Sequence, residues 1–220
     1  MHRVLTSAAL LVLTISPLWG LPERNASQTA QVTVSVYNDA GVPQVVLQRA
    51  ERRAGSIFAR ANVDVVWVNC PHASSEEDAL ACNRIVLALR IIPNATGSTS
   101  GAAFGVAFLS PDGAGRYSDV FWKRAQDLHA TSNLDLGSIL GSVMAHEIGH
   151  LLLGSNAHAV SGIMRAHWEG EELRRIAMEA LLFTPQQARL MRGKARLLES
   201  AEQSVEQPPP EQLMDETSNL

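Results

Sequence analysis

The segment from Ser138 to Leu153 constrains the fold more than any other part of this chain, because it has almost no polar side. Its apolar residues have helical spacing, and a helix that is apolar all round is a buried helix. These residues are Ile139, Leu140, Val143, Met144, Ile148, Leu151 and Leu152. The polar exceptions in its centre are His146, Glu147 and His150. Burying such groups without partners is costly, so we expect a ligand and a cleft beside them.

The two histidines have the spacing of a metal site. His146 and His150 are four residues apart, so their imidazoles lie on one face of a helix, one turn apart. A single tetrahedral Zn²⁺ can bind both side chains. Glu147 lies at the edge of that face, where it reaches a metal-activated water as general base rather than the metal itself. The alternative, a surface helix that carries these letters by chance, conflicts with its apolar surroundings.

The stretch HEIGHLLLGSNAH, followed by Gly162-Ile163-Met164, resembles the metzincin clan of zinc endopeptidases. The resemblance covers approximately residues 31–168. It implies three zinc ligands, a general base, a chain reversal after the helix and a hydrophobic floor beneath the zinc. The resemblance assigns the zinc ligands to His146, His150 and His158 and the general base to Glu147. It places Gly154 at the chain reversal and Met164 in the floor beneath the zinc.

The spacing after the second histidine departs from the family pattern. In that pattern a glycine follows three residues after the second histidine, and the third histidine three residues later. Here both gaps are four residues, to Gly154 and then to His158. Leu153 and Asn156 stand at the usual places, but leucine disfavours a left-handed turn and an Asn amide is a poor zinc ligand beside imidazole. His158 is therefore the predicted third ligand.

Other third ligands remain open, and so do two other functions. The rival ligands are Asn156, His167 and a downstream carboxylate from Glu169, Glu171 or Glu172. A carboxylate ligand would indicate a gluzincin-type peptidase. The non-enzymatic alternative is a catalytically inactive exported domain that binds zinc or another protein. The predicted function is a secreted zinc endopeptidase acting on protein or peptide substrates.

The hydrophobic pattern predicts an α+β fold, a metzincin-like domain with a twisted, mixed five-stranded sheet. We expect a crossover helix between two parallel strands, a buried active-site helix and C-terminal helices. The expected strands are 31–39, 63–69, 83–92, 102–110 and 116–123. The expected helices are 45–61, 138–153, 168–183 and 184–199.

The chain ends and the cysteines predict export. Residues 1–20 have the layout of a signal peptide, 21–30 form a linker, 31–199 the peptidase domain and 200–220 a disordered acidic tail with prolines. Cys70 and Cys82 are expected to form a disulfide in an oxidising compartment. We therefore predict a secreted or extracytoplasmic protein, in the periplasm or cell envelope where such compartments exist.

Charge and hydropathy limit the partners. The formal net charge of −4 argues against a nucleic-acid-binding protein, which normally has a basic surplus. The body of the chain has no run of apolar residues long enough to cross a bilayer. We therefore expect no stable membrane insertion after signal cleavage.

Overall fold

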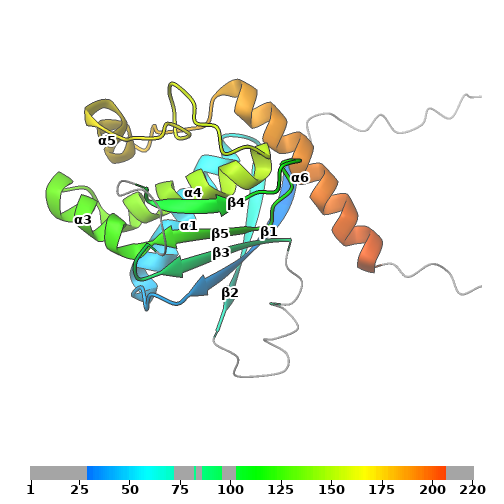
Figure 1. Cartoon of the computed structure of the whole chain (residues 1–220), viewed down its shortest axis with the longest axis horizontal. Coiled ribbons are helices and arrows are strands. Elements are labelled where there is room, and N and C mark those ends of the chain that lie inside the picture. The colour runs from blue at the N-terminus through cyan, green and yellow to red at the C-terminus, as the bar shows by residue number, and fades with distance from the viewer. Residues whose placement is uncertain (1–28, 72–81, 83–85, 96–102, 207–220) are drawn as a thin grey trace, which may run out of the picture.

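The computed structural model describes residues 29–71, 82, 86–95 and 103–206. The expected signal peptide, most of the expected linker and residues 207–220 of the expected tail lie outside the described residues. Within the described part, five strands form a single sheet, and there are five helices (Figure 1).

The sheet has the order β2-β1-β3-β5-β4. Its strands are β1 (Ala30–Asn38), β2 (Val63–Cys70), β3 (Leu87–Ile92), β4 (Gly105–Phe108) and β5 (Tyr117–Phe121). The pairs β1–β2, β1–β3 and β3–β5 are parallel, whereas β4 is antiparallel to β5 and forms one edge. The predicted α+β fold with a mixed five-stranded sheet is therefore confirmed.

Two helices cover one face of this sheet. Helix α1 (Gln44–Ala59) is the crossover between β1 and β2, and α4 (Leu136–Leu153) packs beside it (Figure 1). Val32, Val34 and Val36 alternate along β1 and are fully buried in the same core as both helices. The period-2 apolar pattern of the first strand thus provides the surface on which the helices pack.

Helix α4 is the central element of the core. Asp135 caps its N-terminus by accepting a hydrogen bond from the Ser138 amide (2.8 Å), and Gly154 ends it in the left-handed conformation at φ 64°. By length and hydropathy α4 could cross a membrane, but 83% of it is buried inside the protein. It is therefore a core helix, as its nearly uniform apolar character predicted.

The fifth strand is shorter than expected, and an unexpected helix follows it. The strand predicted over 116–123 ends at Phe121, and α3 (Trp122–Ser132) begins at the next residue. This helix has no start signal in the sequence, because Phe121 at its N-cap makes no side-chain capping bond. His129, expected in a polar connection, lies in the last turn of α3.

Other strands and helices also have bounds that differ from the predicted ones. The strand expected over 83–92 begins at Leu87, although residues 83–85 lie outside the described part, and the strand expected over 102–110 shortens to Gly105–Phe108. The helix expected over 168–183 is α5 (Gly170–Ala177), which ends because Glu179 is left-handed at φ 55°. The last helix, α6 (Pro185–Glu206), continues into the segment assigned to the disordered tail.

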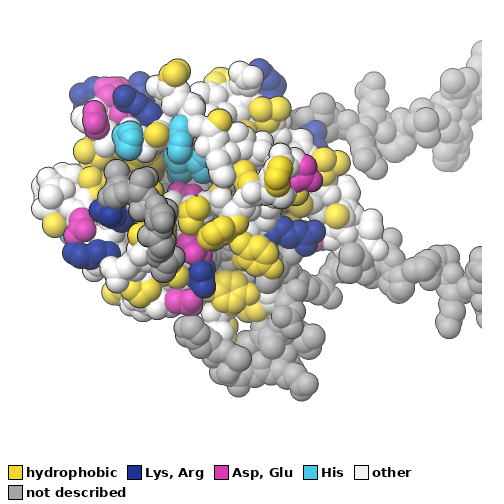
Figure 2. Space-filling view, viewed as in Figure 1, with side chains coloured by type: hydrophobic (Ala, Val, Ile, Leu, Met, Phe, Trp, Pro, Cys, Tyr) yellow, Lys and Arg dark blue, Asp and Glu magenta, His cyan; other side chains and the backbone are white. Residues whose placement is uncertain are grey.

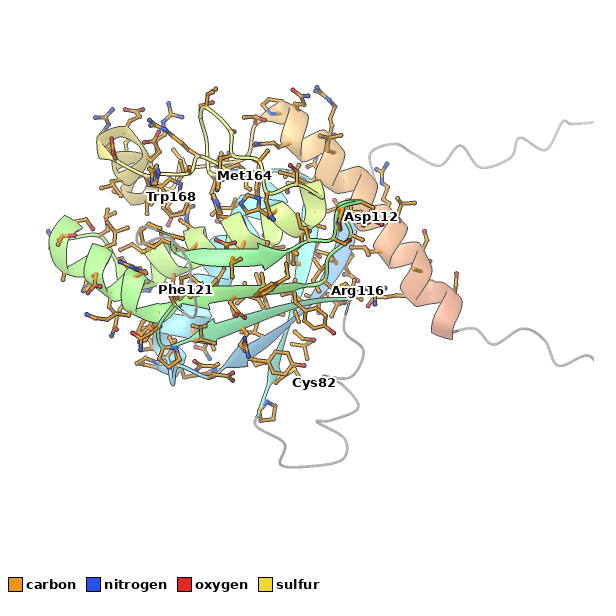
Figure 3. All side chains as sticks on the ribbon, in the orientation of Figure 1. Cys82, Asp112, Arg116, Phe121, Met164 and Trp168 are labelled. Carbon is orange, nitrogen blue, oxygen red and sulfur yellow. A yellow bond between two sulfur atoms is a disulfide. The ribbon has the colours of Figure 1, made fainter. Side chains whose placement is uncertain are left out.

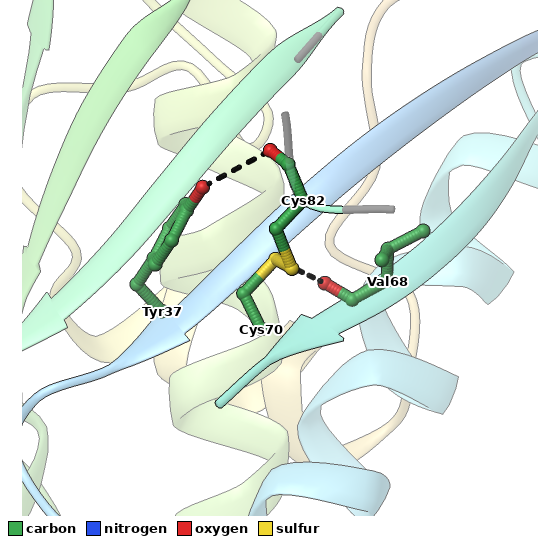
Figure 4. The surroundings of a disulfide bond; sticks show 4 residues. All are labelled: Tyr37, Val68, Cys70 and Cys82. Atoms are coloured by element: carbon green, nitrogen blue, oxygen red, sulfur yellow. Dashed lines mark hydrogen bonds between the residues drawn. A yellow bond between two sulfur atoms is a disulfide. The ribbon is translucent and has the colours of Figure 1, made fainter. Parts of the chain in front are cut away.

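Cys70 and Cys82 form the expected disulfide, with Cα atoms 5.8 Å apart (Figure 4). Cys70 is the last residue of β2, the strand at the edge of the sheet opposite β4. The Tyr37 hydroxyl of β1 donates a hydrogen bond to the Cys82 carbonyl (3.3 Å). The bridge therefore fixes Cys82 against the end of the β1–β2 pair.

Candidate metal centre

Three histidines from two segments meet at one point. His146 and His150 are buried on one face of α4, and His158 is exposed in the loop that follows Gly154. One ring nitrogen from each lies within 4.8 Å of the others. Figure 2 shows histidine side chains gathered on the surface above β4. The structure thus brings together all three histidines that the sequence predicted as ligands.

Backbone carbonyls fix the orientation of the two helical imidazoles. His146 Nδ1 lies 2.7 Å from the Ile163 carbonyl oxygen, and His150 Nδ1 lies 2.7 Å from that of Ser155. A carbonyl oxygen only accepts, so each Nδ1 carries the ring hydrogen when the imidazole is neutral. Each Nε2 then presents a lone pair to the centre of the cluster, the arrangement in which histidine binds metals.

The distance between the two Nε2 atoms indicates whether a metal fits. His146 Nε2 and His150 Nε2 are 3.0 Å apart. Since both ring hydrogens lie on Nδ1, no hydrogen is available to join the two lone pairs, and they repel one another. A cation bound between them and the His158 nitrogen removes that repulsion. Three neutral imidazoles are a donor set suited to Zn²⁺.

Burial keeps the cluster neutral. It lowers the pKa of His146 to about 3, with a further contribution from the neighbouring His150. The pKa of His150 is also lowered by burial, and that of His158 by burial and by the nearby His167. Because protonated imidazole cannot bind a metal, these shifts favour the binding-competent form.

Glu147 lies beside the cluster in a dry environment. Burial raises the pKa of its carboxyl group to about 8. The side chain packs against the backbone of β4, where a Cβ on Gly105 would come within 2.7 Å of Glu147 Cδ and 2.5 Å of the Asp119 carbonyl oxygen. Gly105, which interrupted the predicted strand pattern, therefore allows the edge strand to approach the carboxyl group closely.

The three histidines and Glu147 open into a cleft of about 290 Å³. One wall is β4 with the residues before it, and the other is the segment after His158. Two aromatic rings join the walls at one point, because Phe104 stacks on Trp168 with ring centroids 5.7 Å apart. Trp168 also contacts His146 edge-on at 5.8 Å. Sequence spacing did not indicate the stacking of Phe104 on Trp168, because these two residues are far apart in the chain.

Met164 is fully buried, and its sulfur atom packs against α4 at Gly149. A Cβ on Gly149 would lie 2.8 Å from its sulfur atom. The Met164 carbonyl accepts a hydrogen bond from the Ala159 amide (2.8 Å), which closes the loop after His158. Figure 3 labels Met164 and Trp168 on the segment between α4 and α5. The methionine expected as a floor therefore lies against the helix that carries the cluster.

The rival histidine and the rival carboxylates do not belong to the cluster. Asn156 and His167 line the cleft, but His167 does not join the metal-ligand group found among the described residues. Glu171 binds Arg174 and Arg175, and Glu172 binds Arg165. Glu169 accepts a capping-box bond at the start of α5. In the described part of the chain, no carboxylate joins the three histidines.

No family model and no curated protein matches the sequence. Among solved structures, a zinc-dependent peptidase from Methanocorpusculum labreanum (strain Z) is similar with a TM-score of 0.48 and 17% identity, over 72% of this chain and 99% of that chain. At that level of likeness, function has to be inferred from the residues of this chain.

Proposed function

We propose that this protein is an exported zinc-dependent endopeptidase of the metzincin type. The observation that carries the proposal is the distance of 3.0 Å between the Nε2 atoms of His146 and His150, each of which has its Nδ1 hydrogen-bonded to a backbone carbonyl. A third imidazole and a buried glutamate lie next to this pair. The cluster suits Zn²⁺, and the glutamate beside it suits proton transfer.

Zinc bound here would supply Lewis-acid polarisation of a carbonyl and lower the pKa of water. The residues of the chain supply the rest. His146, His150 and His158 hold the metal. Glu147 accepts a proton from the attacking water and later donates it to the leaving amine. Without a metal, burial raises the pKa of this carboxyl group to about 8; a bound Zn²⁺ would lower it again by favouring the carboxylate, the form that accepts the proton in the first step.

The edge strand offers a binding mode for the substrate. Gly105, Val106 and Ala107 of β4 line the cleft, and the sheet order leaves the outer edge of β4 without a neighbouring strand among the described residues. An extended peptide can add to such an edge through main-chain hydrogen bonds. This mode of binding holds a peptide bond across the cleft and tolerates varied side chains.

Export is proposed on two observations. The disulfide is typical of proteins in oxidising compartments, and the first twenty residues have a signal-peptide layout. The protein would then act on peptides or proteins outside the cytoplasm.

The test combines metal analysis with a digestion assay. Purified protein is expected to contain one zinc per chain by elemental mass spectrometry and to cleave casein or members of a random peptide library. Glu147→Gln should keep the zinc and lose activity by about 10²- to 10⁴-fold, the usual contribution of a general base. Glu171→Gln, an exposed glutamate bound to arginines of α5, is the matched control and should behave as wild type.

Three results would contradict the proposal. Folded protein without stoichiometric metal would overturn the zinc site. Zinc without cleavage of any peptide would favour the inactive binding domain. A Glu147→Gln variant as active as the parent would show that Glu147 is not the general base.

A further inference from the structure

The proposed active-site cleft contains a fixed cation. Of the described residues that line the cleft, Arg165 alone is a lysine or arginine. It directly follows Met164, on the same wall of the cleft as Trp168. Apart from the histidines, the only other titratable side chain among these lining residues is the Glu147 carboxyl, to which the proposed mechanism gives the role of base. The function of the cation is therefore open.

A buried acid holds the Arg165 side chain in place. Arg165 Nη1 donates to Glu172 Oε1 at 2.8 Å, and the Glu172 side chain is only 8% exposed. The other carboxylate oxygen, Oε2, accepts from the Glu169 amide at 3.3 Å, so the glutamate is itself anchored to the start of α5. The Arg165 side chain is 41% exposed, and its other guanidinium nitrogens form no hydrogen bond with the described residues. A positioned guanidinium with free donors suits a carboxylate ligand.

The cleft is also asymmetric along its length. Phe104 and Trp168 join its two walls at one point, as described above. Elsewhere a second, more open hollow of about 590 Å³ adjoins it, sharing Ala107 and Asn156. That hollow is lined by Phe108 and Tyr117, which are paired across β4 and β5 and about half exposed. A peptide along β4 therefore has room to extend over Phe108, while the Phe104–Trp168 contact restricts it elsewhere.

We propose that Arg165 recognises a carboxylate of the substrate, so that the enzyme prefers peptides with a carboxylate close to the scissile bond. The inference rests on the proposed peptidase function. The carboxylate is either the C-terminus of the peptide or the side chain of Asp or Glu. In both cases the peptide's remaining residues extend along β4 toward Phe108.

The test uses the peptide that the wild-type protein cleaves best in the library. It is synthesised with a free C-terminus and as the C-terminal amide, each with Glu or with Gln at the residues flanking the cut. Values of kcat/KM are measured by chromatography and mass spectrometry for wild type, Arg165→Gln and Arg165→Lys. Arg174→Gln is the matched control, because Arg174 also pairs with a glutamate of α5 but does not line the cleft. Zinc content is measured for every variant.

We expect wild type to favour one carboxylate form by about tenfold, the size of a charge-assisted hydrogen bond in a partly exposed site. A preference for the free acid over the amide identifies the C-terminus, and a preference for Glu over Gln identifies a side chain. Arg165→Gln should abolish the preference mainly through KM, with zinc content unchanged, and Arg165→Lys should restore part of it. Arg174→Gln should keep it.

Two outcomes overturn the inference while leaving the peptidase function intact. In the first, wild type cleaves carboxylate and neutral forms equally well. In the second, the preference survives in Arg165→Gln. Failure of wild type to cleave any peptide would instead overturn the proposed function itself, so the two failures are distinguishable.

Discussion

Each imidazole on α4 depends on a residue outside that helix. The carbonyl that holds His146 comes from Ile163, and the one that holds His150 comes from Ser155. Both belong to the segment that also contains His158. Because such partners set the tautomer and ring direction of metal-binding histidines, this segment would orient two ligands of the proposed zinc site and contribute the third.

His158 should therefore be needed for tight metal binding. His158→Ala removes one of three nitrogens and is expected to weaken zinc binding by at least about 100-fold, more than the loss of an orienting partner usually costs. The affinity is measured by competition with a chromogenic chelator.

The control for this experiment is His129→Ala, because His129 lies in α3, away from the cluster. Its zinc affinity should match that of the parent. If His158→Ala binds zinc as tightly as the parent and His167→Ala does not, the third ligand is His167 instead.

At the scale of elements, the position of α4 depends on a close contact with α1. A Cβ on Gly141 of α4 would lie only 2.4 Å from the Ala50 carbonyl oxygen and 2.7 Å from Arg53 Cβ in α1. Backbone atoms cannot move aside as a flexible side chain can. The glycine thus lets the two helices approach closely enough to share one core.

Gly141→Ala should consequently destabilise the protein, although alanine is the better helix former. We expect the free energy of unfolding to fall by about 2 kcal/mol, the usual cost of overpacking a core. Chemical denaturation followed by circular dichroism measures the change.

Gly193→Ala in α6 is the matched control, because nothing lies within 4 Å of a Cβ there. It should raise the free energy of unfolding by about 0.5–1 kcal/mol through helix propensity alone. Equal effects of the two substitutions would show that α1 and α4 are not in such close contact.

At the scale of the whole molecule, the sheet separates the two edges by role. Strand β4 lines the cleft at one edge, whereas β2 ends in the disulfide at the other. The three strands between these edges, β1, β3 and β5, and the helices behind them connect the two. Stability at the β2 edge and chemistry at the β4 edge should therefore vary independently.

Replacing both Cys70 and Cys82 by serine tests this separation. Closing a loop with a sequence separation of 12 residues is worth about 3 kcal/mol of unfolding free energy. We expect the double variant to lose about that much stability in denaturant, and to keep the zinc affinity and peptidase activity of the parent at low temperature. A reducing agent should destabilise the parent and leave the double variant unchanged. Loss of zinc from a still folded double variant would contradict the separation.

How far prediction from sequence succeeded depended on whether the pattern was local. The buried helix around His146 was predicted within two residues because its periodicity and its terminal glycine are contained in one segment. Helix α3 was missed because its start carries no capping side chain and directly follows a strand. The carboxylates considered as rival ligands could be set aside only in three dimensions, where Glu171 and Glu172 bind arginines.

The sequence by itself determined which groups share one face of a helix, since a four-residue spacing and the helical repeat place His146 and His150 together wherever the helix packs. It also determined the mixed sheet, through strand patterns and the crossover helix. Only the tertiary structure decided that His158 meets the other two, that Glu147 is dry and has a raised pKa, and that Arg165 lies in the cleft. The physical reason is that nitrogen distances, burial and carbonyl partners arise from contacts between separate segments, which no local spacing encodes.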